Sequence, residues 1–108
     1  MRMLLKATIP VETGNAAVAA GTLGTTIQKI LAAMQPEAAY FTEDGGDRTA
    51  WVFFDMKNSS ELTSLAEPWF LAFNAKVTVR PAMNPQDLVE GLPGMQQAVK
   101  AYGKATGA

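Results

Sequence analysis

The segment of residues 48–56 constrains the fold most, because it is apolar along both sides of an expected β-strand. Successive side chains of a strand point to opposite faces of its sheet. One side of this strand is formed by Ala50, Val52, Phe54 and Met56. The other side contains Trp51 and Phe53 before it reaches Asp55. A sheet with one face in water alternates cleanly between apolar and polar residues, so the segment predicts a sheet that is covered on both faces.

Three further strands follow from the same period of two, at residues 2–9, 37–43 and 75–83. Pro10 ends the first of them. The turn at residues 43–47 contains two glycines, which favour the positive φ angles of a tight hairpin. The second and third strands are therefore expected to be adjacent and antiparallel.

Helical periodicity predicts a helix over residues 15–35, with a break or bend near residues 21–24, where two glycines weaken it. A second helix should begin at Asn58, which can cap it, and Pro68 should kink or end that helix. Asn84 can cap a third helical segment. Gly91, Pro93 and Gly94 interrupt that segment, so residues 84–103 should form a tail of two short helices.

The resulting order, βαββαβ with a C-terminal helical extension, is that of the ferredoxin-like α+β fold. We expect residues 1–108 to form a single domain of this kind. In such a fold both helices pack on one face of a four-stranded antiparallel sheet, and the opposite face is open. Trp51 and Phe53 should lie on that open face, which therefore needs a cover.

Composition excludes several classes of function. The sequence contains neither cysteine nor histidine, which removes thiol nucleophiles, the usual haem ligand and the leading zinc ligand. No metal site and no cofactor are therefore expected. The formal net charge is −1, whereas nucleic-acid-binding domains usually carry a basic surplus. No run of residues is apolar and long enough to span a membrane, and by elimination a cytoplasmic location is expected.

Three kinds of cover for the open face are possible: the C-terminal helices, a second sheet, or nucleic acid. RNA-recognition domains share this topology and bind RNA on the open sheet. Residues 47–54 match only part of their third-strand motif, because Asp47 stands in place of the basic first residue and Thr49 in place of a stacking aromatic. With the neutral charge, this departure argues against nucleic acid.

Three segments, residues 6–10, 36–41 and 66–70, have a pattern that resembles the dimeric α+β barrel superfamily, and in particular its small uncharacterised bacterial members. The resemblance covers most of the chain and includes no catalytic signature. It implies a homodimer in which two ferredoxin-like subunits join their open faces into a barrel. Cofactor-independent monooxygenases and muconolactone-isomerase-like enzymes share that build, so the resemblance implies a small-molecule site in the lumen.

On this arrangement the ligand-binding candidates are the open-face residues Lys6, Thr8, Tyr40, Trp51, Phe53, Lys76, Thr78 and Arg80. The basic groups could hold a carboxylate or enolate, and the aromatic rings could stack on a ring. Tyr40 and Asp55 are the candidates for proton transfer, if burial moves their pKa toward neutrality. An anionic aromatic molecule suits this set of side chains.

Each of these residues also has a structural interpretation. Trp51 and Phe53 can be simple dimer-core residues, and Lys76 and Arg80 can protect an edge strand from aggregation. Lys6 can form a plain cross-strand ion pair with Asp55. Three functions therefore stay open: a small-molecule-binding or metabolic protein, a cofactor-independent isomerase or monooxygenase acting on an anionic aromatic or lactone substrate, and a structural or regulatory interaction module.

Overall fold

The computed structural model describes residues 1–103 of the chain. Its first half contains strand β1 (Arg2–Ile9), helices α1 (Val11–Ala19) and α2 (Leu23–Met34), and the hairpin of β2 (Ala38–Asp44) and β3 (Asp47–Asp55). The second half contains a short 3₁₀ helix (Ser59–Glu61), helix α3 (Leu62–Phe73), strand β4 (Lys76–Pro81) and helix α4 (Pro85–Tyr102). This is an α+β chain with a ferredoxin-like core, as the sequence predicts.

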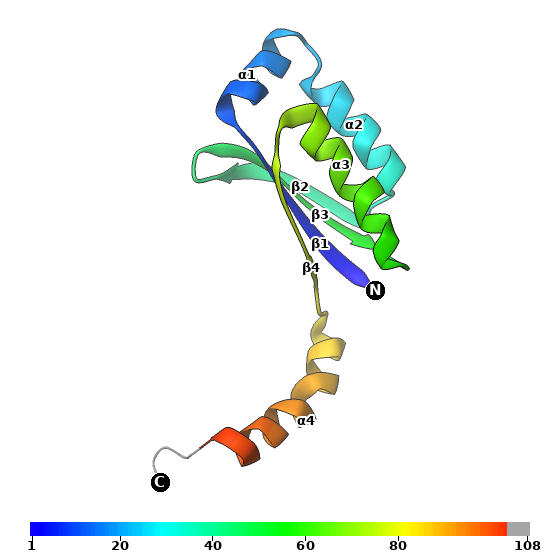
Figure 1. Cartoon of the computed structure of the whole chain (residues 1–108), viewed down its shortest axis with the longest axis vertical. Coiled ribbons are helices and arrows are strands. Elements are labelled where there is room, and N and C mark those ends of the chain that lie inside the picture. Colours follow the sequence, from blue (N-terminus) through cyan, green and yellow to red (C-terminus); the bar gives the residue numbers. More distant parts are fainter. Residues whose placement is uncertain (104–108) are drawn as a thin grey trace.

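The four strands form one antiparallel sheet in the order β2-β3-β1-β4. Helices α1, α2 and α3 lie together on one side of it (Figure 1). The core between the two layers contains the alternate residues of β1 and β3 that point to the helices, together with Trp69 and Phe73 of α3 and Ile30 of α2. The expected inward set of β1 (Met3, Leu5, Ala7 and Ile9) is buried.

The helical layer departs from the expected ranges in two places. The break near residues 21–24 is present and separates α1 from α2, but α1 already begins at Val11, directly after Pro10. Pro68 is expected to kink or end the second helix, and it does not end the helix, because α3 continues through it to Phe73. Trp69 and Phe73 lie beyond the proline and are fully buried, and burial of two large aromatic side chains outweighs the backbone hydrogen bond that proline cannot make.

The expected helix starts at Asn58 and Asn84 are confirmed. Each asparagine accepts a hydrogen bond from the backbone, and an acid three residues later, Glu61 or Asp87, accepts one from the backbone N–H of the asparagine. Both starts are therefore capping boxes, which fix the direction in which the helices begin.

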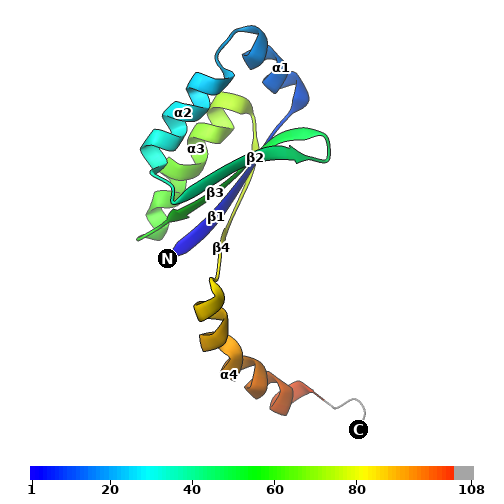
Figure 2. The same cartoon turned by 180° about the vertical axis from the view of Figure 1, so that it is seen from behind.

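The expected pair of short C-terminal helices is wrong, because α4 is one continuous helix that passes through Gly91, Pro93 and Gly94. No residue of α4 is buried. The helix leaves the end of β4 and projects away from the sheet, so the described chain measures 62 × 30 × 21 Å (Figure 2). Its radius of gyration is 18.3 Å, whereas a compact chain of this size has about 13 Å. In this structure α4 therefore does not cover the open face of its own sheet.

Candidate functional site

The open face is the side of the sheet that looks away from α1, α2 and α3, and its side chains form three rows across the strands. The middle row contains Tyr40, Trp51, Lys6 and Thr78. The row on one side contains Thr42, Thr49, Thr8 and Lys76. The row on the other side contains Ala38, Phe53, Leu4 and Arg80. The structure thus brings all the predicted ligand-binding residues together, and their role as ligand contacts stays a prediction.

Trp51 and Phe53 are only half-buried on this face, whereas Val52 and Phe54 on the other side of the same strand are fully buried. Leu4 is half-buried beside Phe53. Helices α1, α2 and α3 all lie on the far side of the sheet, and α4 points away (Figure 1). The apolar centre of the open face is therefore uncovered within residues 1–103.

Lys6 lies at the centre of the middle row and is half-buried. Its Nζ atom is 5.0 Å from the centroid of the Trp51 ring, within the range of a cation–π contact. The same ammonium forms an ion pair with Asp44 at the end of β2. The suggested pair between Lys6 and Asp55 is not formed, because the strand register sets Lys6 opposite Trp51 and Asp55 opposite Arg2.

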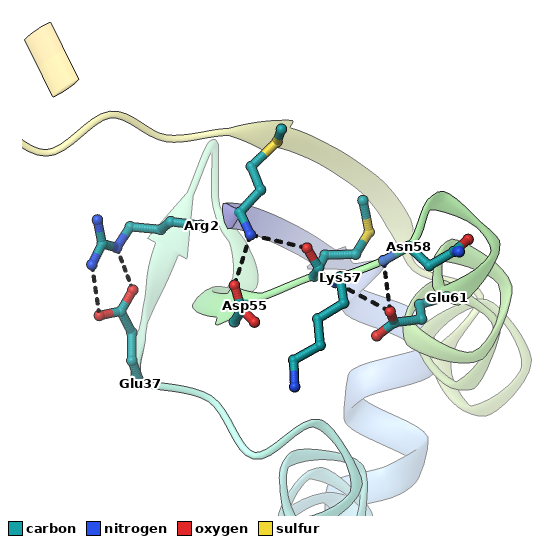
Figure 3. Close-up of polar contacts among 8 residues, drawn as sticks. Arg2, Glu37, Asp55, Lys57, Asn58 and Glu61 are labelled. Atoms are coloured by element: carbon teal, nitrogen blue, oxygen red, sulfur yellow. Dashed lines mark hydrogen bonds and ion pairs between the residues drawn. The ribbon is translucent and has the colours of Figure 1, made fainter. Parts of the chain in front are cut away.

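Asp55, one of the two candidates for proton transfer, is bound at the end of β3 by the amino group of Met1, which donates a hydrogen bond of 2.7 Å to its Oδ1 atom (Figure 3). This hydrogen bond, together with the positive charge of the amino group, lowers the pKa of Asp55 below its ordinary value. Proton transfer near neutral pH requires a shift in the opposite direction. The Tyr40 side chain, the other candidate, is 65% exposed.

A cleft of about 650 Å³ lies where the end of the sheet meets the start of α4, and Arg2, Glu37, Asp55 and Asp87 are among its lining residues. Its charges are already paired within the chain. The guanidinium of Arg2 donates hydrogen bonds of 2.5 and 3.4 Å to the two carboxylate oxygens of Glu37, which raises the pKa of Arg2 (Figure 3). Asp87 belongs to the capping box of α4. These groups join the elements at this end of the sheet and leave little charge free for a ligand.

A second cleft, of about 360 Å³, lies on the helical side between α2 and the hairpin, and it is lined mainly by apolar groups of Ile9, Leu23, Ile27, Phe41 and Ala50. Phe41 points to the helical side, as expected from the alternation, because it pairs with buried Ala50. It is nevertheless 53% exposed, since β2 is an edge strand and the cleft leaves its ring open. None of the predicted ligand-binding residues lines this cleft.

Two residues of interest were missing from the candidate set. Thr49 is 2% exposed and lies between Thr42 and Thr8 in the threonine row, so it belongs to the floor of the open face. The alternation of β3 places it two residues before Trp51, and this signal was sufficient to find it. Glu37 could not be found in this way, because Arg2 and Glu37 come from the ends of strands that are separated by β3.

Among residues 1–103, no cluster of three or more acidic side chains has a geometry that could hold a metal ion. Over the same residues, none of the helices combines the length and the apolar character that crossing a membrane requires.

Comparison with known proteins shows a distant likeness of fold. No profile of a protein family and no curated protein matches the sequence. Among solved structures, a formyltetrahydrofolate deformylase from Pseudomonas putida KT2440 aligns with a TM-score of 0.48 and 17% sequence identity. The alignment covers 76% of this chain and 29% of the deformylase, so the chain spans less than a third of that enzyme. A likeness at this level supports no argument about function.

Proposed function

We propose that two copies of this chain pack their open faces together and bind a small anionic aromatic molecule between the two sheets. The observation that carries the proposal is the middle row of the open face, where Lys6 lies over the ring of half-buried Trp51 and Tyr40 and Thr78 flank the pair. The row combines an aromatic surface with a cation and hydroxyl groups, which is the mixture that ligand pockets use.

A second sheet is the cover that the open face fits best. Two sheets pack face to face at about 10 Å, and the side chains of both fill the space between them. The large residues Trp51, Phe53 and Leu4 can fill that space near the middle of the face. Leu4 lies between Phe53 and Arg80, so the Arg80 guanidinium can reach a gap left beside these residues.

Arg80 supplies the charge for an anion. Its guanidinium has no carboxylate partner among residues 1–103, and its Nη2 atom lies 3.4 Å from the Thr78 hydroxyl. Strand pairing sets Arg80 opposite Leu4, so it lies next to the apolar centre. A free guanidinium beside an aromatic surface can bind a carboxylate in bidentate fashion while a ring stacks nearby.

Binding is proposed rather than catalysis because Asp55, one of the two candidates for proton transfer, has a lowered pKa and a partner in the Met1 amino group. A cofactor-independent reaction needs a group whose pKa lies near the working pH.

The test is a thermal-shift titration with benzoate, with benzyl alcohol as the uncharged comparison. We expect benzoate to raise the melting temperature of the wild type, and Arg80→Ala and Lys6→Ala to lose most of that shift. Lys29→Ala is the matched control, because Lys29 is an exposed lysine on α2, on the other side of the sheet. Equal shifts in all four proteins, or equal shifts with benzyl alcohol, would count against an anion site on the open face.

A further inference from the structure

Helix α4 carries an apolar stripe along its whole length. Its members follow spacings of four and three residues, which places them on one side of a helix. The α4 stripe consists of Leu88, Leu92, Met95, Val99 and Tyr102. All five are exposed, from 42% at Leu92 to 83% at Tyr102. Polar residues such as Gln97 occupy the opposite side, so α4 is an amphipathic helix whose apolar side lacks a partner within residues 1–103.

The sequence of α4 makes a partner necessary. Gly91 and Gly94 each disfavour a helix by about 1 kcal/mol relative to alanine, and Pro93 does so by about 3 kcal/mol. Even sequences with good propensity form helices of this length only marginally when they are surrounded by water. In proteins, such a helix is maintained by packing of its apolar side. The continuous helix over residues 85–102 therefore indicates a surface on which the α4 stripe packs.

The direction of α4 indicates where that surface lies. Figures 1 and 2 show α1, α2 and α3 on one side of the sheet, whereas α4 extends beyond the end of β4 and bends toward the opposite side. Both figures are viewed along the shortest dimension of the molecule, 21 Å, so they show most of the distance by which α4 extends from the sheet. An 18-residue helix is about 27 Å long, whereas a sheet packed on the open face would lie about 10 Å away. A second copy on the open face would therefore lie alongside α4.

We propose that α4 is an arm that packs its stripe against a second copy of this chain, with the two arms exchanged across a two-fold axis. The proposal rests on the open-face dimer proposed above. The start of α4 favours exchange over a return to its own sheet. Ala82 still pairs with Arg2 at the end of β4, and the capping box of Asn84 and Asp87 sets the helix direction only two residues later.

The area of the contact supports an exchange of arms. Four strands about 4.8 Å apart and about 26 Å long present a flat face of roughly 500 Å². A helix about 27 Å long and about 10 Å wide adds roughly 270 Å² of flat area, and each copy both gives and receives one arm. The two arms thus roughly double the contact to about 1,040 Å², which is ample for a stable interface that buries about 800 Å² of accessible surface on each partner.

Sedimentation of full-length variants tests the arm. Leu92→Asp places a charge in the middle of the stripe, and Gln97→Asp places the same charge on the polar side as the matched control. The two-fold axis places Leu92 in two equivalent contacts. We expect Leu92→Asp to weaken each contact by about tenfold, and therefore to raise the dimer dissociation constant by about a hundredfold. Gln97→Asp should leave it within about threefold of the wild type. Circular dichroism and thermal unfolding of each variant establish that the core remains folded.

A cross-linking experiment identifies the partner surface directly. The chain has no cysteine, so Val99→Cys introduces a single thiol for a photoreactive benzophenone label. In a mixture of ¹⁵N-labelled and unlabelled copies, we expect cross-linked peptides that combine the two isotopes. If both peptides of every cross-linked pair carried the same isotope, α4 would fold back on its own chain, and the proposal of an exchanged arm would be wrong.

The outcomes separate the arm from the proposed ligand site. If Phe53→Asp dissociates the dimer and Leu92→Asp does not, the arm is wrong and the open-face contact stands. If Leu92→Asp dissociates the dimer and Phe53→Asp does not, the arm stands and the site between the sheets is wrong. A wild-type protein that stays monomeric at high micromolar concentration would overturn both.

Discussion

Both sides of strand β3 contain large apolar residues, but these residues differ in their surroundings. Val52 and Phe54 are fully buried beneath the helical layer, whereas Trp51 and Phe53 are half-buried on the open face. One strand thus needs two covers, and residues 1–103 supply only one. Apolar surface that a chain leaves uncovered in this way marks an interaction site.

Helices α3 and α4 also differ in whether their apolar sides are covered. Each contains an internal proline and an apolar side, but α3 buries Trp69 and Phe73 against the sheet, whereas α4 buries no residue. The proline in α3 is tolerated because intramolecular packing stabilises the helix. By the same reasoning, the proposed contact with a second copy would supply the packing that α4 does not obtain within residues 1–103.

The largest expected effect on stability concerns Phe54, on the helical side of β3. Phe54→Ala should lower the free energy of unfolding by about 3–5 kcal/mol, because it removes a ring that is 1% exposed from a packed core. Phe53→Ala, one residue away on the open face, should cost less in unfolding and should weaken dimerisation instead. Denaturant titrations at low protein concentration, where a dimer is dissociated, measure the first difference. Equal losses of stability would mean that the two faces are buried alike in the single chain.

A smaller effect concerns the polar end of β3. The folded-state pKa of Asp55 is lowered, so its ion pair with Met1 should stabilise the fold at pH values above the unfolded pKa of about 3.9. That contribution should disappear as the pH falls through the folded pKa. The difference in melting temperature between wild type and Asp55→Asn should be constant from neutral pH to about pH 5 and shrink at lower pH. A difference that stayed constant down to pH 2 would contradict the assigned pair.

Much of the fold was predictable because its signals are local. The period of two in β1 and β3 gave the strands and their two faces, and the asparagines at positions 58 and 84 gave the helix starts. The set of open-face residues follows from that alternation, whereas their arrangement in three rows depends on the register. Their spatial proximity is a consequence of strand pairing, and their function remains a proposal.

The errors concern residues whose structure depends on packing. Pro68 and Pro93 both lie inside continuous helices. In α3 the burial of Trp69 and Phe73 outweighs the low helix propensity of proline, whereas α4 buries no residue and its continuity depends on the proposed contact with a second copy. The ion pair of Lys6 with Asp44 rather than Asp55 depends on the register and on the position of the hairpin. No spacing in the sequence encodes such a contact.

Quenching of tryptophan fluorescence by acrylamide tests the central claim that a second copy covers the open face. The protein has two tryptophans, and Trp69 is fully buried in the core, so the quenchable emission comes from Trp51. We predict that Trp51 is protected at high micromolar concentration and becomes quenchable on dilution to the nanomolar range, with a midpoint equal to the dimer dissociation constant from sedimentation. A Trp51 that is quenched equally well at every concentration would contradict the claim, because the open face would then be bare in solution.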